Sequence, residues 1–183
     1  MMMQMLSAGG MPALADHLRR PDEDNPRGYY EFERVKQVSE DASWLDEAQG
    51  KVVKMVYRLL YDLPRDHTYR VIFMRRELHE VIASQEVMLE RHGKAGSPPI
   101  HRHGQDQDDR LADIYRRQLD EVMSWLHNQP NFSVLCVDYG DVLSDPQRVV
   151  HQLNRFLDGR LDMDAMLRVP DWSLYRQRVD ATG

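Results

Sequence analysis

Residues 69–84 read YRVIFMRRELHEVIAS and change character partway along. The run 69–74 is almost continuously apolar, which is typical of a strand buried on both faces of a parallel sheet. From Glu77 onward, apolar residues recur at helical spacing among charged ones. A strand that passes directly into a helix indicates an α/β fold, and Arg75 and Arg76 stand at the junction.

Two further runs, KVVKMV (51–56) and FSVLCVDY (132–139), are also predicted to be buried strands. Strands that alternate with helices predict an α/β protein, here a three-layer sandwich with a mainly parallel sheet. Two amphipathic helices are expected between the second and third strands, with buried stripes made of Leu78, Val81, Ile82, Met88 and Leu89 in the first and of Leu111, Ile114, Tyr115, Leu119, Val122 and Leu126 in the second.

The remaining segments contain two helices with clear boundaries. MMMQMLSAGG (1–10) predicts a hydrophobic helix that ends at Gly9–Gly10. Near the C-terminus, Ser144 or Asp145 is the expected N-cap of a helix with Pro146 in its first turn, and Gly159 is expected to stop it.

Two other segments are less regular. Residues 30–48 are predicted to form one helix, and residues 93–109 are predicted to form a mobile surface loop because they contain Gly, Pro and charged residues without periodicity. We expect all of these elements to belong to a single domain, 1–183.

Composition limits the partners and the compartment. The 24 basic and 30 acidic residues give a net charge of -6, which argues against nucleic acid or an anionic membrane as a partner. The longest apolar runs are far shorter than the roughly 18 residues that span a bilayer. Cys136 is the single cysteine, so a disulfide framework is excluded. With no secretory leader visible, the expected compartment is the cytoplasm.

The junction at residues 75–84 is a candidate anion site. Ligands of open parallel sheets bind beyond the carboxyl ends of the strands, which is where Arg76 stands. A helix rises about 1.5 Å per residue, so an extended Arg76 side chain can reach an anion that Ser84 also touches. A guanidinium and a hydroxyl both suit phosphate. The alternative is that the arginines pair with Glu77 or Glu80.

These residues resemble a known family. FMRRELHEVIAS (73–84) is similar to the 3′-phosphate-binding segment of sulfotransferases that use 3′-phosphoadenosine 5′-phosphosulfate (PAPS). VLCVDYGDVLSDPQRVVHQLNRFL (134–157) resembles the late strand, turn and helix of that family, and 24–33 and 171–178 resemble further elements of its bacterial branch. The likeness covers nearly the whole chain.

The resemblance implies a fold like that of the P-loop proteins and a nucleotide site. Arg76 and Ser84 would bind the 3′-phosphate, Tyr139 would lie near the adenine, and Arg176 would close over the 3′-phosphate, although the usual Arg-Lys-Gly of that closing loop is absent. The implied ligands are PAPS and its product 3′,5′-diphosphoadenosine (PAP), without a metal. The implied activity is transfer of a sulfuryl group to a hydroxyl or amine acceptor.

The resemblance also implies a missing element. In the family, a strand and a Pro-x-Ser-Gly-Thr-Ser/Thr loop precede a helix like that at 1–10, and the loop binds the 5′-phosphosulfate. We therefore expect the first strand to be missing from this chain. A start codon placed too far downstream is favoured over a shortened protein, because loss of a central strand would expose sheet edges.

Candidates for the catalytic base are few. No histidine matches the position that the small-molecule branch uses, so Glu31 and Glu33 are named as candidates by analogy with branches that use a glutamate. Both residues equally fit first-turn helix carboxylates. Lys54 and Arg58 are candidates to flank the acceptor or the leaving phosphate.

Other functional classes remain open. A metal site is disfavoured, because the histidines at 92, 101 and 103 and the aspartates at 106, 108 and 109 lack further ligands at a supporting distance. A kinase would need magnesium ligands and a Gly-Lys-Ser/Thr loop. The main alternative to an enzyme is a non-catalytic nucleotide-binding or assembly domain of the same fold, for which a homodimer is one arrangement.

Overall fold

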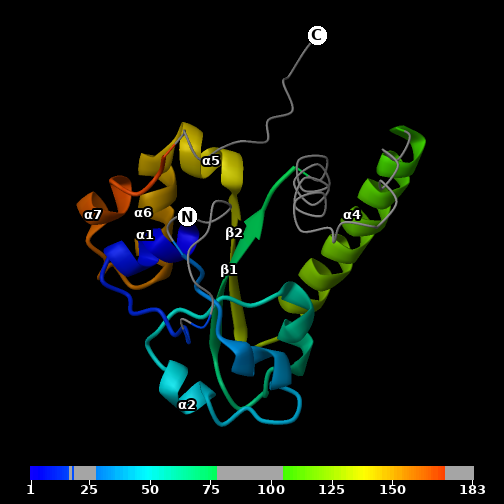
Figure 1. The fold of residues 1–183 in the computed structure, drawn as a ribbon, viewed down its shortest axis with the longest axis horizontal. Helices are drawn as coiled ribbons and strands as arrows, with labels where there is room; N and C mark the ends of the chain where they lie inside the picture. The colour runs from blue at the N-terminus through cyan, green and yellow to red at the C-terminus, as the bar shows by residue number, and fades with distance from the viewer. Residues whose placement is uncertain (17, 19–27, 78–104, 172–183) are drawn as a thin grey trace.

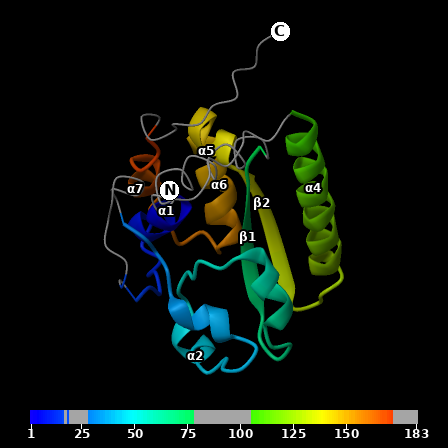
Figure 2. The ribbon, with the colours of Figure 1, turned by 45° about the vertical axis from the view of Figure 1, so that its right-hand side comes forward.

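The computed structural model describes residues 1–16, 18, 28–77 and 105–171, and Figures 1 and 2 show their arrangement. Within these residues, none of the helices combines the length and the hydropathy that crossing a bilayer requires. In chain order, the helices, 3₁₀ helices (η) and strands are α1 (Met2–Ala8), η1 (Glu33–Gln37), α2 (Leu45–Ala48), η2 (Tyr57–Asp62), β1 (Tyr69–Arg75), α4 (Gln105–His127), β2 (Phe132–Asp138), α5 (Tyr139–Ser144), α6 (Pro146–Phe156) and α7 (Met163–Leu167).

The sheet of the described chain consists of β1 and β2, which run parallel. Tyr69 lies opposite Phe132 and Arg75 lies opposite Asp138, so the two strands begin together and end together. The α/β class and the parallel pairing of two predicted strands are therefore confirmed.

The predicted strand at 51–56 is wrong. Val52 forms an isolated parallel bridge with Ala13, held by two backbone hydrogen bonds of 2.9 Å, and the chain then enters η2. The side chain of Lys54 is exposed, and Val56 is 63% exposed. The run thus lacks the burial on both faces that the prediction assumed, because its lysines require contact with water.

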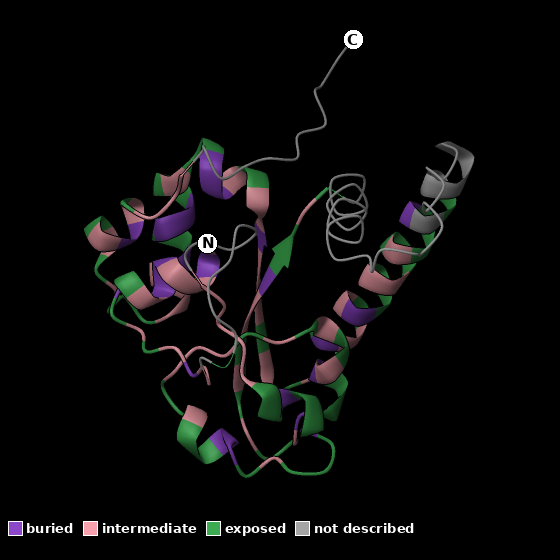
Figure 3. Cartoon of the chain, in the orientation of Figure 1, coloured by how far each residue is buried: buried purple, intermediate pink, exposed green. Residues whose placement is uncertain are grey.

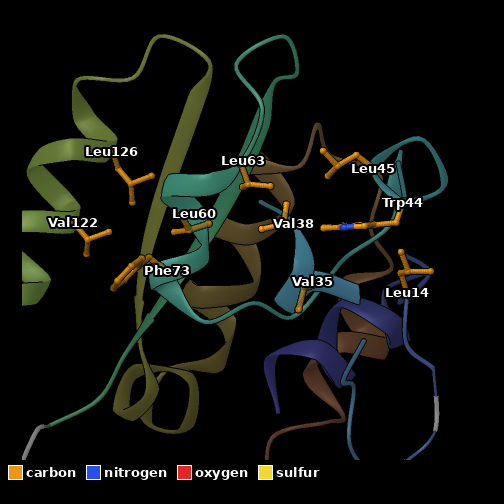
Figure 4. Packing of buried hydrophobic residues seen from close by; sticks show 10 residues of the cluster. All are labelled: Leu14, Val35, Val38, Trp44, Leu45, Leu60, Leu63, Phe73, Val122 and Leu126. Carbon is orange, nitrogen blue, oxygen red and sulfur yellow. The ribbon is translucent and has the colours of Figure 1, made fainter. Parts of the chain in front are cut away.

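One face of the sheet packs into the first core. This core takes alternate strand residues, Val71 and Phe73 from β1 and Val134 and Cys136 from β2. Figure 4 shows that side chains from α4 and from the irregular segments before β1 meet there. Its buried members are Leu14, Val35, Val38, Trp44, Leu45, Leu60, Leu63, Phe73, Val122 and Leu126.

The opposite face packs into the second core. Ile72 and Leu135 point into it, because successive side chains of a strand lie on opposite faces. Buried residues of α1, α5 and α6 are purple in Figure 3. The buried members of this core are Met2, Met5, Leu6, Val137, Val142, Val149, Val150, Leu153 and Met166. Both strands are therefore covered on both sides.

Helix α4 begins earlier than predicted. Its first residue is Gln105, so residues 105–109 are helical and not part of a loop, whereas 93–104 lie outside the described residues. Acidic residues favour the first turn of a helix, and this signal outweighed the lack of apolar periodicity. Val122 and Leu126 are buried as predicted, but Ile114 is 52% exposed. The helix predicted around residues 78–89 also lies outside the described residues.

The single helix predicted over 30–48 is wrong. The segment forms η1 and α2, separated by a turn. In this turn, Asp41 Oδ1 accepts a hydrogen bond of 2.9 Å from the Ser43 backbone N–H. Arg34 Nη2 donates to Asp41 Oδ2 and to Ser43 Oγ, at 2.9 Å each. Such side-chain bonds compete with the helical hydrogen bonds of the backbone and favour a turn between η1 and α2.

The predicted boundaries of α1 and α6 are confirmed. Helix α1 ends just before Gly9, and Gly10 has a φ of 93°. Asp145 is the N-cap of α6, because its Oδ1 accepts a hydrogen bond of 3.1 Å from the Arg148 backbone N–H. Pro146 occupies the first turn, and Gly159 follows the helix with a φ of 71°.

Candidate functional site

Two of the predicted site residues leave the sheet at the same edge. Arg76 directly follows the last residue of β1, and Tyr139 directly follows the last residue of β2. Because the strands are parallel and end opposite one another, these two residues emerge side by side although 63 positions separate them in the chain. In Figure 1, the tip of β1 and the start of α5 lie at the upper edge of the sheet.

The side chains of these residues are in contact. The guanidinium carbon of Arg76 lies 5.2 Å from the centroid of the Tyr139 ring, and both residues are half-buried. This is a cation–π arrangement, in which the negative face of the ring attracts the cation. A guanidinium carries its N–H donors in a planar fork, a geometry that suits bidentate binding of an oxyanion.

The carboxylates that flank Tyr139 in the sequence form ion pairs. Arg75 Nη2 donates to Asp138 Oδ2 at 2.8 Å, and this hydrogen bond raises the pKa of Arg75. Two positions after Tyr139 in the sequence, Asp141 Oδ2 lies 2.9 Å from Arg148 Nη2, and this contact raises the pKa of Arg148. The two carboxylates that flank Tyr139 in the sequence therefore each have an arginine partner.

Glu31 and Glu33 have contacts with the N-terminal part of the chain. Glu31 Oε1 lies 3.7 Å from Lys54 Nζ, and both carboxylate oxygens of Glu33 accept hydrogen bonds from Lys36. The Glu33 backbone N–H donates to Asp16 at 2.7 Å. In both views, η1 lies toward the edge where the strands begin, whereas Arg76 follows the edge where they end (Figures 1 and 2). Their role as a base stays a prediction.

The other predicted site residues cannot be placed in this site. Ser84 and Arg176 lie outside the described residues, as do the histidines at 92, 101 and 103. Within the described ranges, no group of three or more His, Cys, Asp or Glu side chains is arranged to hold a metal ion.

A second polar feature was not predicted. An open hollow of about 300 Å³ is lined by Tyr57, Arg58, Tyr61, Gln118 and Glu121. It lies between η2 and α4, and Tyr57 donates to Gln118 Oε1 at 2.9 Å. Burial raises the pKa of Tyr61, whose ring centroid lies 4.5 Å from that of Trp125. Arg58, expected to flank the acceptor or the leaving phosphate, lines this hollow.

The Arg75–Asp138 ion pair and the hollow between η2 and α4 are both features that the sequence analysis missed. The Arg75–Asp138 pair was not predicted, because Arg75 lies just beyond the predicted strand 69–74 and the sequence does not fix the register of that strand with 132–139. No sequence pattern predicted the hollow. Tyr57 and Gln118 meet only because η2 packs beside α4, and the sequence indicated a strand in place of the segment leading into η2.

Comparison with known proteins does not assign this site. No family model matches the chain, and no curated protein or solved structure is significantly similar to it.

Proposed function

We propose that this chain is a sulfotransferase-like protein that binds PAPS and transfers its sulfuryl group to a hydroxyl or amine acceptor. Arg76 and Ser84 bind the ribose 3′-phosphate, Tyr139 lies beside the adenine, and Arg176 closes over the phosphate. The observation that carries the proposal is the 5.2 Å contact between the Arg76 guanidinium and the Tyr139 ring. Arg76 and Tyr139 were assigned to the same ligand from separate sequence segments, and they are neighbours in space.

The position and chemistry of this contact fit the nucleotide. It lies beyond the carboxyl ends of two parallel strands, the usual location of ligands in open α/β sheets. A cation for a phosphate and an aromatic ring for a base stand next to one another, as a phosphorylated adenosine requires. The proposal includes the finer fold, a three-layer sandwich of the sulfotransferase type.

The residues of this chain have distinct roles in the proposed reaction. The nucleotide supplies the sulfuryl group, whose bond to the phosphate oxygen breaks as the acceptor oxygen or nitrogen bonds to sulfur. Arg76 holds the phosphate end and fixes the orientation of the donor. The acceptor loses a proton to a general base. Glu31 and Glu33, named for this role from the sequence, lie toward the opposite edge of the sheet from Arg76, so the base is left unassigned.

Calorimetric titration with PAP tests the nucleotide site. Arg76→Ala is expected to weaken binding at least tenfold, or by about 1.4 kcal/mol. Arg70→Ala is the matched control, because it removes an arginine from the other end of β1. Equal affinity of a folded Arg76→Ala variant and the wild type would refute the site. Binding of PAPS without transfer to any hydroxyl or amine acceptor would favour the non-catalytic alternative.

A further inference from the structure

The last pair of residues in the β1–β2 ladder is also an ion pair. Arg75 and Asp138 lie directly opposite one another, and their side chains are joined by a hydrogen bond of 2.8 Å. Each side chain is about half exposed, at 48% and 47%. The pair therefore links the two strands at the point where both leave the sheet, one residue before Arg76 and Tyr139.

The same strand offers an internal comparison. At its other end, Arg70 Nη1 lies 2.7 Å from Asp158 Oδ2, with side chains 46% and 59% exposed. Chemistry, distance and exposure are nearly the same as in the Arg75–Asp138 pair. The difference is that Asp158 belongs to the turn after α6, so this pair joins a strand to a turn and not one strand end to the other.

The strand-end pair also affects the local charge. Asp138 precedes Tyr139, and Asp141 follows it two positions later. Arg75 and Arg148 compensate these carboxylates at 2.8 Å and 2.9 Å. An anion that approaches this edge is thus not opposed by two uncompensated negative charges.

We propose that Arg75 and Asp138 are positioning residues, which clamp the ends of β1 and β2 so that the Arg76 guanidinium stays over the Tyr139 ring. The inference rests on the proposed function only for the identity of the ligand. Exposed ion pairs contribute little to stability, so variants of this pair are expected to fold. Their effect falls on the geometry of the neighbouring contact.

NMR of the ligand-free chain tests the clamp directly. In the wild type, the Arg76 side-chain protons are expected to show ring-current shifts and nuclear Overhauser effects from Tyr139. Arg75→Ala and Asp138→Asn are each expected to weaken these signals, and the control Arg70→Ala is expected to leave them unchanged. Absence of the signals in the wild type, or unchanged signals in both clamp variants, would overturn the inference.

The affinity for PAP distinguishes a positioning role of the Arg75–Asp138 pair from a purely electrostatic effect of its charges. Asp138→Asn removes a negative charge near an anion site, so charge alone predicts tighter binding. Positioning predicts that both single variants weaken binding by about fivefold, within the range of coupling between neighbouring residues. The exchanged double variant Arg75→Asp/Asp138→Arg is expected to restore both the NMR contact and the affinity. Tighter binding by Asp138→Asn, or no recovery in the exchanged variant, would contradict the clamp.

The two proposals fail in different ways. If the wild type shows the Arg76–Tyr139 contact and its dependence on the pair but does not bind PAP, the nucleotide assignment is wrong and the clamp stands. If the wild type binds PAP but the contact is insensitive to both clamp variants, the clamp is wrong and the nucleotide site stands.

Discussion

The two faces of the β1–β2 sheet are covered by cores of different chemistry. The buried members of the second core are all Met, Leu or Val, and away from the sheet they come from α1, α5, α6 and α7. The first core contains Trp44 and Phe73, and further aromatic residues pack against it. Apart from α4, its helical contributions come from the short segments η1, α2 and η2.

The segments of the two cores differ in how far their local sequence determines their structure. Helix α6 carries its own start signal, because Asp145 caps the helix that Pro146 begins. Among the residues that the structure describes, no side-chain hydrogen bond caps η1, α2 or η2, and tertiary contacts act together with the Asp41 turn in shaping the segments of the first core. One example is the edge-to-face packing of Phe32 on Trp44, with ring centroids 5.6 Å apart. The second core is thus determined more locally than the first.

The largest expected effect is at Trp44, in the first core. Trp44 is 2% exposed, and Trp44→Ala is expected to lower the free energy of unfolding by about 3–5 kcal/mol. Within the described chain the Trp44 indole N–H has no hydrogen-bond partner, so burying it is a cost. Trp44→Phe keeps an aromatic ring against Phe32 and removes this N–H. It should therefore lose less than half as much stability in urea unfolding, and an equal loss would show that ring contact does not stabilise this core.

A smaller effect is expected at the start of α6, beside the second core. Asp145→Ala removes the acceptor for the Arg148 N–H and is expected to cost about 1 kcal/mol, as for other N-caps. Asp145→Asn retains an acceptor oxygen and is expected to stay close to the wild type in urea unfolding. Equal losses in both variants would assign the effect to the ion pair between Arg148 and Asp145 and not to the cap.

The fold was predictable where local chemistry and tertiary packing agree. Strand β1, strand β2 and helix α6 combine strong apolar patterns with turn or cap residues, and their predictions are confirmed. The predictions for 51–56 and 30–48 are wrong because weak local patterns were overruled, in the first case by exposure of Lys54 and in the second by the Asp41 turn.

The site was predictable in part for the same reason. The sequence placed Arg76 and Tyr139 near the ends of two predicted strands, and the parallel register of β1 and β2 then places them side by side. The pairing of Arg75 with Asp138 depends on the exact register, which the apolar runs do not specify.

The smallest expected effect is a pH dependence in the turn between η1 and α2. Hydrogen bonds from Ser43, and then the Arg34 guanidinium, lower the pKa of Asp41 from 3.8 to about 2. A carboxyl group whose pKa is lower in the folded state stabilises that state at pH values above its pKa in the unfolded chain. This contribution is lost as pH falls from about 4 to about 2. Asp41→Asn is therefore expected to lose less stability than the wild type over this interval. NMR titration measures the pKa of the Asp41 carboxyl in the folded state, and urea unfolding at each pH measures the free energy of unfolding. An ordinary Asp41 pKa would show that the turn does not depend on the charge of this residue.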